Sequence, residues 1–254
     1  MFEINTLLFL AVVALGAMVQ TLTGFAMGLI TMAGVAVLGI ADIAFSAAVV
    51  SFVSFVNALV ALRQGYRQVD WQLVRWVVIG LLPAMVCGIA LLAYLSENHY
   101  NILRLLLGFV IILAGSLLMI SPAPFTHRSG RFMQSAAGVS GGLLAGLYSA
   151  GGAPLAYFMY RQPVALNVIR FSLLAIFAIT TSARSIMVGV FGQLNMSIVV
   201  MSAAAVPLVI VVTLATARLT PHVPDRLVRV LVFFVLVVVG GILIFGGRGL
   251  APSF

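Results

Sequence analysis

Long apolar segments are the feature that most constrains how this chain can fold. Of its 254 residues, 63% are hydrophobic and only 7% are charged, whereas a typical soluble domain has roughly 25% charged residues. A soluble fold cannot cover its surface with so few charges. A membrane-spanning helix needs about 20 mostly apolar residues, and such segments follow one another along the chain, separated by short polar loops. The sequence therefore predicts an all-α polytopic integral membrane protein.

The apolar segments are of two kinds. Two of them, residues 5–40 and 132–160, contain glycines, and the second also contains a proline. Glycine and proline weaken or break helices because glycine is conformationally free and proline lacks an N–H donor. The remaining segments are predicted to be full spans, at residues 44–62, 74–95, 102–120, 165–191, 195–217 and 227–246. The order is one broken segment followed by three spans, and it occurs twice.

The two halves of the chain also resemble each other weakly in sequence. Residues 68–70 (Gln-Val-Asp) lie over 193–195 (Gln-Leu-Asn), and at a slightly larger offset Gly24 lies over Gly152. At the first offset Arg104 also lies over Arg229 and Gly115 over Gly240, and Pro83 falls within one residue of Pro207. Transporters are often built from internal repeats. We therefore predict one membrane domain made of two repeats, residues 1–125 and 126–254.

The arginines predict how the broken segments cross the membrane. The net charge is +8, and the chain contains no lysine. If each broken segment were a single crossing, the loop arginines would divide six against six. If each is a hairpin that returns to its starting side, ten arginines lie on one side and two on the other. The positive-inside rule predicts such a bias.

We therefore predict hairpins, with both termini outside and the arginine-rich loops in the cytoplasm of a cell inner membrane. A hairpin plus three spans makes an odd number of crossings, so the second repeat should be inverted relative to the first. The basic charge is assigned to topology and lipid headgroups, and no nucleic-acid partner is expected. The lipid bilayer is the predicted environment, and the sequence leaves the oligomeric state open.

The hairpin tips are the predicted functional site. An arm of about 10–16 residues rises only 15–24 Å at ~1.5 Å per residue, so each tip should stop inside the ~30 Å hydrocarbon core. The returning helices are expected to begin near Gly24 and Ala153, where free N–H groups and the helix dipole favour an anion. Inverted repeats would bring both tips together near the midplane. The predicted substrate-binding residues there are Gln20, Thr21, Thr23, Gly24, Phe25, Ser149, Gly151, Gly152, Ala153 and Pro154.

Glycines can instead serve close helix packing, and that interpretation is preferred for Gly138, Gly142 and Gly146, which are spaced four residues apart. Arg184 is the one charge deep inside a span. Such residues usually face a cavity, so Arg184 is a further candidate for substrate binding. Snorkelling to the outer interface and pairing with carbonyl groups of another helix are the alternatives. Asn57 is a weaker candidate on the roughly equivalent helix of the first half.

At these residues the chain resembles the TauE/SafE family of sulfite and organosulfur-anion exporters, also called the toluene sulfonate uptake permease group. The resemblance rests on Thr-Gly-Phe-Ala-Met-Gly at 23–28, on Gly-Leu-Tyr-Ser-Ala-Gly-Gly-Ala-Pro-Leu at 146–155, and on Arg63-x-Gly65 followed by Val-Asp-Trp at 69–71. The first motif has fewer glycines than is usual, and Ala153 replaces a common Pro or Gly. The resemblance implies transport of sulfite, sulfonates, thiosulfate or related anions across a bacterial inner membrane.

The predicted function is therefore secondary transport of a small anion, and the resemblance implies that this anion contains sulfur. No cofactor, metal or catalytic residue is expected. The H-E-x-x-H motif does not occur, the Gly-Val-Ser-Gly-Gly at 138–142 follows no predicted strand and so forms no nucleophile elbow, and the three histidines lie far apart in the sequence. Two alternatives stay open at this point. One is a membrane scaffold or assembly protein without transport, and the other is an intramembrane enzyme. The single cysteine, Cys87, is expected to be a small core residue.

Overall fold

The computed structural model describes residues 2–119, 125–192 and 194–219, and within these ranges the regular structure is helical. The predicted span 227–246 lies outside the described residues. The helices are α1 (Phe2–Thr23), α2 (Met27–Leu38), α3 (Ile43–Leu62), the short η1 (Tyr66–Gln68), α4 (Trp71–Asn98), α5 (Tyr100–Met119), α6 (Arg131–Tyr148), α7 (Gly152–Tyr160), α8 (Leu166–Val190) and α9 (Met196–Leu219).

Five of the described helices are long and apolar enough to cross a membrane, namely α1, α3, α4, α8 and α9. The predicted spans 44–62, 165–191 and 195–217 agree with α3, α8 and α9 to within about two residues. Helix α4 is longer than its predicted span at both ends. Pro83 does not interrupt it. The all-helical, multi-span architecture predicted from hydropathy is therefore confirmed.

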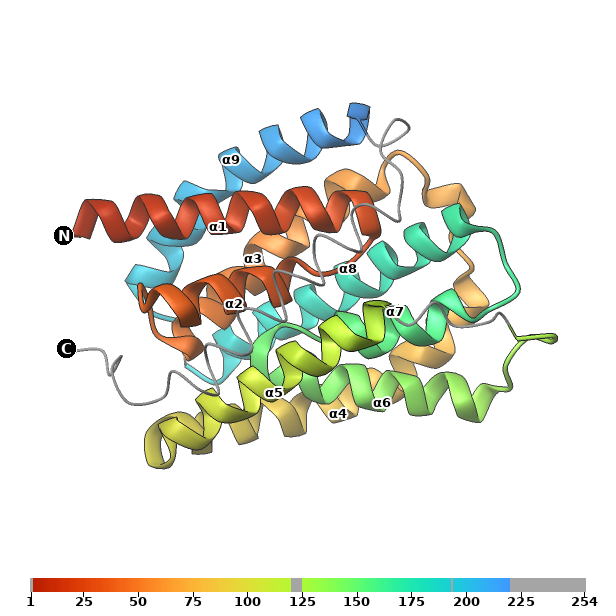
Figure 1. The fold of residues 1–254 in the computed structure, drawn as a ribbon, viewed down its shortest axis with the longest axis horizontal. Helices are drawn as coiled ribbons and strands as arrows, with labels where there is room; N and C mark the ends of the chain where they lie inside the picture. Colours follow the sequence, from red (N-terminus) through yellow and green to blue (C-terminus); the bar gives the residue numbers. More distant parts are fainter. Residues whose placement is uncertain (1, 120–124, 193, 220–254) are drawn as a thin grey trace.

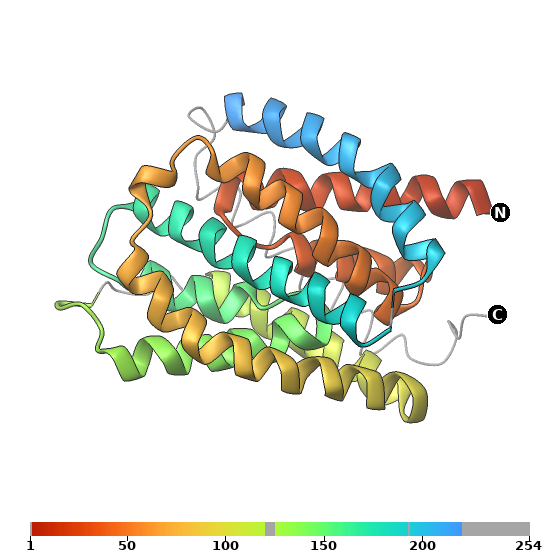
Figure 2. The same cartoon turned by 180° about the vertical axis from the view of Figure 1, so that it is seen from behind.

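The described helices run back and forth between two ends of the molecule (Figures 1 and 2). One end, here called the arginine end, carries the α3–α4, α5–α6 and α7–α8 loops and the last residues of α9. The opposite end, here called the Asp42 end, carries the α2–α3, α4–α5 and α8–α9 loops. Helix α2 runs back alongside α1, and α7 runs back after α6, so neither pair crosses the molecule as one continuous helix.

The arms of these two broken segments differ from the expected lengths. Helix α1 has 22 residues, which corresponds to about 33 Å and is enough to cross the hydrocarbon core. The prediction of a half-length first arm was therefore wrong. The threonines do not stop the helix, because Thr21 and Thr23 donate their hydroxyls to carbonyl groups four residues back, at Ala17 and Val19. The returning helices are the short ones, with 12 residues in α2 and 9 in α7.

Glycines let α4 and α6 pack with their backbones nearly in contact. A Cβ atom added at Gly138 would lie 2.0 Å from the carbonyl oxygen of Val77, and one at Gly142 would lie 2.3 Å from that of Leu81. From the α4 side, a Cβ at Gly80 would lie 2.0 Å from the carbonyl oxygen of Ser135. No larger residue fits at these positions without moving a helix. The packing interpretation of the α6 glycines is therefore confirmed.

The outer faces of the bundle are apolar. Helices α4 and α9 have the smallest buried shares among the spanning helices, at 39% and 28% of their most apolar windows, whereas α3 is 61% buried. Large apolar side chains such as Ile79 of α4 and Val200 of α9 are exposed on these outer helices, as lipid contact requires. Cys87 is also exposed. Its expected core position was wrong, because helix periodicity alone does not say which face of α4 meets α6.

Candidate functional site

The first helix break lies between α1 and α2, at Gly24–Ala26. Gly24 and Ala26 both have left-handed backbone conformations, with φ of 87° and 82°. The Thr23 hydroxyl oxygen also accepts from the Phe25 N–H and lies 2.9 Å from the Phe25 carbonyl oxygen, so the threonine stabilises the turn itself. Helix α2 begins at Met27, three residues later than expected, because the chain needs Gly24 to Ala26 to reverse direction.

The second break lies between α6 and α7. Ser149 ends α6 in a left-handed conformation with φ of 53°, and α7 begins at Gly152. Pro154 is the third residue of α7, in the first turn, where a missing N–H leaves no helical hydrogen bond unmade. The chain is as close-packed here as at the α4–α6 contact, since a Cβ at Gly151 would lie 2.1 Å from the carbonyl oxygen of Gly141.

The two breaks contact each other. A Cβ added at Gly28 would lie 1.9 Å from the carbonyl oxygen of Ser149, and one at Gly152 would lie 3.1 Å from the Phe25 ring. A narrow crevice remains between the breaks, but it encloses no space large enough for a water molecule. It is lined by Gln20, Ala26, Met27, Gly28, Leu29, Ser54, Ser149, Ala150, Gly152 and Phe177. The structure thus brings the two predicted tips together in a closed arrangement.

Gln20 is the one side-chain amide that lines this crevice. It is 1% exposed, and its Oε1 accepts a hydrogen bond from the Ser54 hydroxyl at 3.0 Å. Its Nε2 donor has no hydrogen-bond partner among the described residues. A buried polar group without a partner is costly, so this donor is a feature that packing alone does not explain.

Helix α8 packs against both breaks, so the positions along α8 that they contact show the relative depth of the two breaks. A Cβ at Gly24 would lie 2.9 Å from the backbone carbonyl oxygen of Arg170, and one at Gly152 would lie 3.2 Å from the Phe177 ring. Arg184 follows seven residues further along the same helix. Seven residues make about two turns and rise about 10 Å, so these three positions share one face. The first break therefore lies nearer the arginine end than the second.

Arg170 was not a predicted site residue, yet its Nη2 donates to the carbonyl oxygen of Thr21 at the end of α1. This contact gives a hydrogen-bond donor to one of the carbonyl groups at the end of α1. The sequence offered no signal for this contact, because Arg170 counts there as an ordinary loop arginine near the start of a span.

Arg184 does not line the crevice. It is 2% exposed, and its guanidinium donates to backbone carbonyls of α3 and α6, at Ala47 (2.7 Å) and Gly146 (3.0 and 3.3 Å). It also donates to the Ser51 hydroxyl at 2.6 Å. These contacts match the alternative in which Arg184 pairs with carbonyl groups of another helix. The Ser51 hydroxyl lies 3.2 Å from that of Ser149, so Arg184 reaches the second break through one intervening side chain.

Asn57 is fully buried where α1, α3 and α9 meet. Its Nδ2 group lies within hydrogen-bonding distance of three oxygens, at 3.2 Å from the Ala17 carbonyl, 3.1 Å from the Thr21 hydroxyl and 2.7 Å from the Thr213 hydroxyl. Like Arg184, it lies outside the crevice lining. Its observed contacts tie three helices together, and Thr213 was not foreseen as a partner because nothing in the sequence relates it to Asn57.

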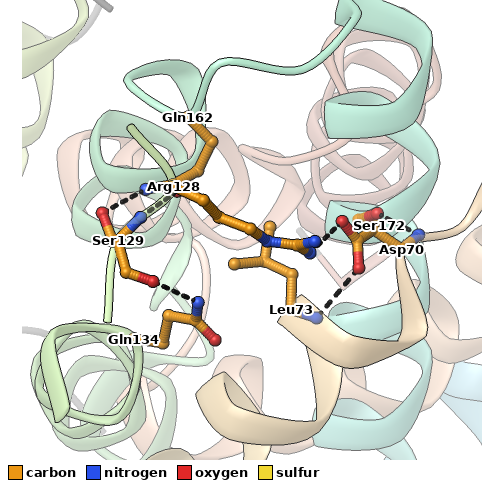
Figure 3. A network of polar contacts seen from close by, with 7 residues as sticks. All are labelled: Asp70, Leu73, Arg128, Ser129, Gln134, Gln162 and Ser172. Carbon is orange, nitrogen blue, oxygen red and sulfur yellow. Dashed lines mark hydrogen bonds and ion pairs between the residues drawn. The ribbon is translucent and has the colours of Figure 1, made fainter. Parts of the chain in front are cut away.

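A polar network at the arginine end joins segments from both halves of the chain (Figure 3). Asp70 forms an ion pair with Arg128 of the α5–α6 loop, and the Asp70 N–H donates to the Ser172 hydroxyl of α8. Beside it, Ser129 accepts from Gln162 and Gln134. Asp70 also caps α4 by accepting from the Leu73 N–H at 3.0 Å.

Replacing Asp70 with alanine should lower the thermal unfolding midpoint of the detergent-purified protein by about 1–8 °C. The loss of an N-cap costs about 0.5–2 kcal/mol, and each kcal/mol shifts the midpoint of a protein of this size by roughly 2–4 °C. Arg128→Ala should change the midpoint far less, because a partly exposed ion pair contributes only ~0–1 kcal/mol. Equal losses in the two variants would show that the ion pair, and not the cap, carries the effect.

The Asp42 end contains a second hollow, with a volume of ≈ 300 Å³, between α3, α4, α8 and α9. Asp42, Ser96 and Glu97 line it together with Arg184 and Asn195. Apart from Arg184, none of these residues was a predicted site residue. They lie close to helix ends in the sequence, where polar residues need no functional explanation.

Comparisons with known proteins identify the chain's relatives. The family described as "Sulfite exporter TauE/SafE" matches residues 8–243. A "Probable sulfite/organosulfonate exporter TauE" from Cupriavidus necator is 38% identical over 230 residues, which cover 91% of this chain and 90% of that protein. No solved structure matches. The family match spans nearly the whole chain, including both helix breaks, and the helices described above are those of a multi-pass membrane protein. The chain therefore belongs to the sulfite exporter TauE/SafE family.

Proposed function

We propose that this protein is a secondary transporter of a small sulfur-containing anion, of the sulfite, sulfonate or thiosulfate class, and that the anion binds between the two helix breaks. Membership of a family of exporters supports transport, and the name of the Cupriavidus necator relative supports the substrate class. A family of exporters favours neither the scaffold nor the enzyme alternative. The proposed location of the anion rests on one observation: the two breaks meet around Gln20, whose Nε2 has no hydrogen-bond partner among the described residues.

The crevice has the chemistry that an oxyanion needs. Helices α2 and α7 both begin there, and the first N–H groups of a helix favour negative charge. Gln20 adds a donor, and Ser54 and Ser149 add hydroxyls. No acidic residue lines the crevice within the described residues. These groups would replace the hydration shell of an anion without placing a full positive charge beside it, so a bound anion could still be released.

Transport requires that the closed crevice opens in turn to each side of the membrane. In this proposal, residues 1–125 and 126–254 are inverted repeats that move against each other. The arginine end faces the cytoplasm and both termini face outward. In this structure, the Asp70–Arg128 network would close the cytoplasmic side of the crevice. The hollow at the Asp42 end lies on the opposite, outward side.

Uptake into liposomes tests the proposed function. Purified protein is reconstituted and exposed to radiolabelled sulfite, thiosulfate, alkanesulfonates and, for comparison, acetate and chloride. We expect uptake of at least one sulfur-containing anion well above that of empty liposomes, and little uptake of acetate. Uptake that does not exceed the empty control for any of these sulfur anions would contradict the proposal.

Replacing Gln20 with glutamate should abolish uptake while leaving the protein folded. Glutamate keeps the acceptor for the Ser54 hydroxyl, but it removes the Nε2 donor and adds a negative charge where the anion binds. At an effective dielectric constant of about 20, two like charges 4 Å apart repel by about 4 kcal/mol, which exceeds a hundredfold in affinity. Gln64→Glu is the matched control, because Gln64 is exposed in the α3–α4 loop. Equal uptake by both variants would place the anion elsewhere.

A further inference from the structure

The hollow at the Asp42 end leads from the surface to a buried cation. Glu97 and Asn195 are exposed at its mouth, whereas Arg184, which also lines it, is 2% exposed. Its volume of ≈ 300 Å³ suits a small molecule or ion with some water. It shares no lining residue with the crevice between the breaks, so it is a separate place.

The charge of Arg184 is not balanced by the protein. Its four hydrogen bonds go to carbonyl groups and one hydroxyl, and no carboxylate among the described residues forms an ion pair with it. Because an arginine side chain has five N–H donors, one Nη2 hydrogen remains. A charge at this depth is costly unless it is paired. A cavity against such a charge is where a counterion would bind.

We propose that this cavity is an outer binding site for a small monoanion, such as a sulfonate, in which Arg184 supplies the attracting charge and the carboxylates of Asp42 and Glu97 reject dianions. That the same ion then reaches the crevice rests on the proposed function. Within its substrate class, this selectivity favours sulfonates and hydrogen sulfite over thiosulfate, which is a dianion. The connection is short, since Arg184 donates to the Ser51 hydroxyl, which lies 3.2 Å from that of Ser149 at the second break. The two sites would lie in series along α8.

The selectivity follows from where the charges lie. Arg184 is buried, so its attraction is weakly screened, whereas Glu97 is exposed and its repulsion is reduced by water and salt. The repulsion from the Asp42 carboxylate is also reduced, because Asp42 accepts hydrogen bonds from the N–H groups of Ala44 and Phe45 at the positive start of α3. One negative charge on the ligand therefore gains from Arg184 more than it loses at the mouth. The net Coulomb gain is proportional to the charge of the ligand, whereas the cost of removing the ligand from water rises with the square of that charge. Because both carboxylates keep the net gain small, it offsets the dehydration of a monoanion but not that of a dianion.

Isothermal titration with methanesulfonate and sulfate tests this charge selectivity on the purified full-length protein at low ionic strength. The wild type should bind methanesulfonate about tenfold more tightly than sulfate. Removing the Glu97 charge in Glu97→Gln should raise methanesulfonate affinity about 2–3-fold and sulfate affinity by about the square of that factor, because Coulomb energy is proportional to the charge of the ligand. Gln64→Lys is the control, since it raises the net charge by the same one unit at an exposed position of the arginine end and should change neither affinity.

Equal affinity of the wild type for the two anions, or an identical effect of Glu97→Gln on both, would overturn the proposal. Because Arg184 also holds α3 to α6, its removal could prevent folding, and the test therefore does not depend on an Arg184 variant. The Glu97 side chain is exposed and makes no hydrogen bond with a described residue, so Glu97→Gln should fold normally.

Cysteine modification locates the binding event independently of transport. Ala93 lines the cavity, and in a Cys87→Ser background Ala93→Cys provides a single reactive thiol. Methanesulfonate should slow its modification by a charged methanethiosulfonate reagent, and should still do so when Gln20→Glu is added, because the crevice is a different place. Protection that disappears with Gln20→Glu, or that never occurs, would contradict an outer site. Transport without protection would overturn this inference alone, whereas protection without transport would overturn the proposed function alone.

Discussion

Substrate uptake should fall by about 10–100-fold when Gly28 is replaced with alanine, although the change adds only one methyl group. The added Cβ would lie 1.9 Å from the carbonyl oxygen of Ser149 and 3.1 Å from the Cα atom of Ala150. Both are backbone atoms, so no side-chain rotation relieves the clash, and the two breaks must separate by about 1 Å or more. Misplacement on that scale costs about a hundredfold in sites that depend on fixed geometry.

The measurement is uptake of the best sulfur anion into liposomes that contain equal amounts of folded protein. Gly189→Ala is the matched control, because Gly189 also lies within a helix but a Cβ there would meet nothing within 4 Å. It should transport like the wild type. Normal uptake by Gly28→Ala would mean that the contact between the breaks is not needed for transport and would count against the proposed binding site.

Gly142→Ala should lower stability, because it places a methyl group in the close contact between α4 and α6. Its Cβ would lie 2.3 Å from the carbonyl oxygen of Leu81 and 3.0 Å from the Leu81 Cα atom. Overpacking of a close-packed contact costs about 1–3 kcal/mol. At roughly 2–4 °C for each kcal/mol, we expect the thermal midpoint in detergent to fall by about 2–12 °C.

Gly189→Ala again provides the control and should have an unchanged or slightly raised midpoint, since alanine is the better helix former by up to ~1 kcal/mol. Gly142→Leu should prevent accumulation of folded protein altogether. If Gly142→Ala were as stable as the wild type, α4 and α6 would not pack as closely as the structure describes.

Much of the architecture was predictable because hydropathy acts locally. An apolar run of sufficient length must become a helix in a bilayer, where backbone groups have no water to bond. The predicted span 44–62 therefore differs from α3 by one residue at its start. Of the ten arginines assigned to one side of the membrane, eight fall among the described residues, and all eight lie at the arginine end, because that assignment depends only on counting crossings.

The details of the breaks were less predictable. Glycine and proline mark where a helix is weak, but they do not say where it ends. The end of α1 and the start of α2 at Met27 depend on Thr23 bonding across the turn, on Arg170 bonding to Thr21, and on the left-handed conformation of Ala26. A sequence pattern does not report a left-handed alanine, since this conformation is unfavourable for it and is imposed by neighbours.

By itself, the sequence determined that the chain is a helical membrane protein with two broken segments, and its motifs indicated the family. The tertiary structure alone decided what those segments contact: that Gly28 meets Ser149, that Gln20 keeps an unpaired donor, and that Arg184 bonds to residues 38 and 137 positions away and faces a separate cavity. The physical reason is range. Hydropathy and helix breaking depend on neighbours within a few residues, whereas a binding site depends on which helix faces pack together, and that is settled by close packing across the whole bundle.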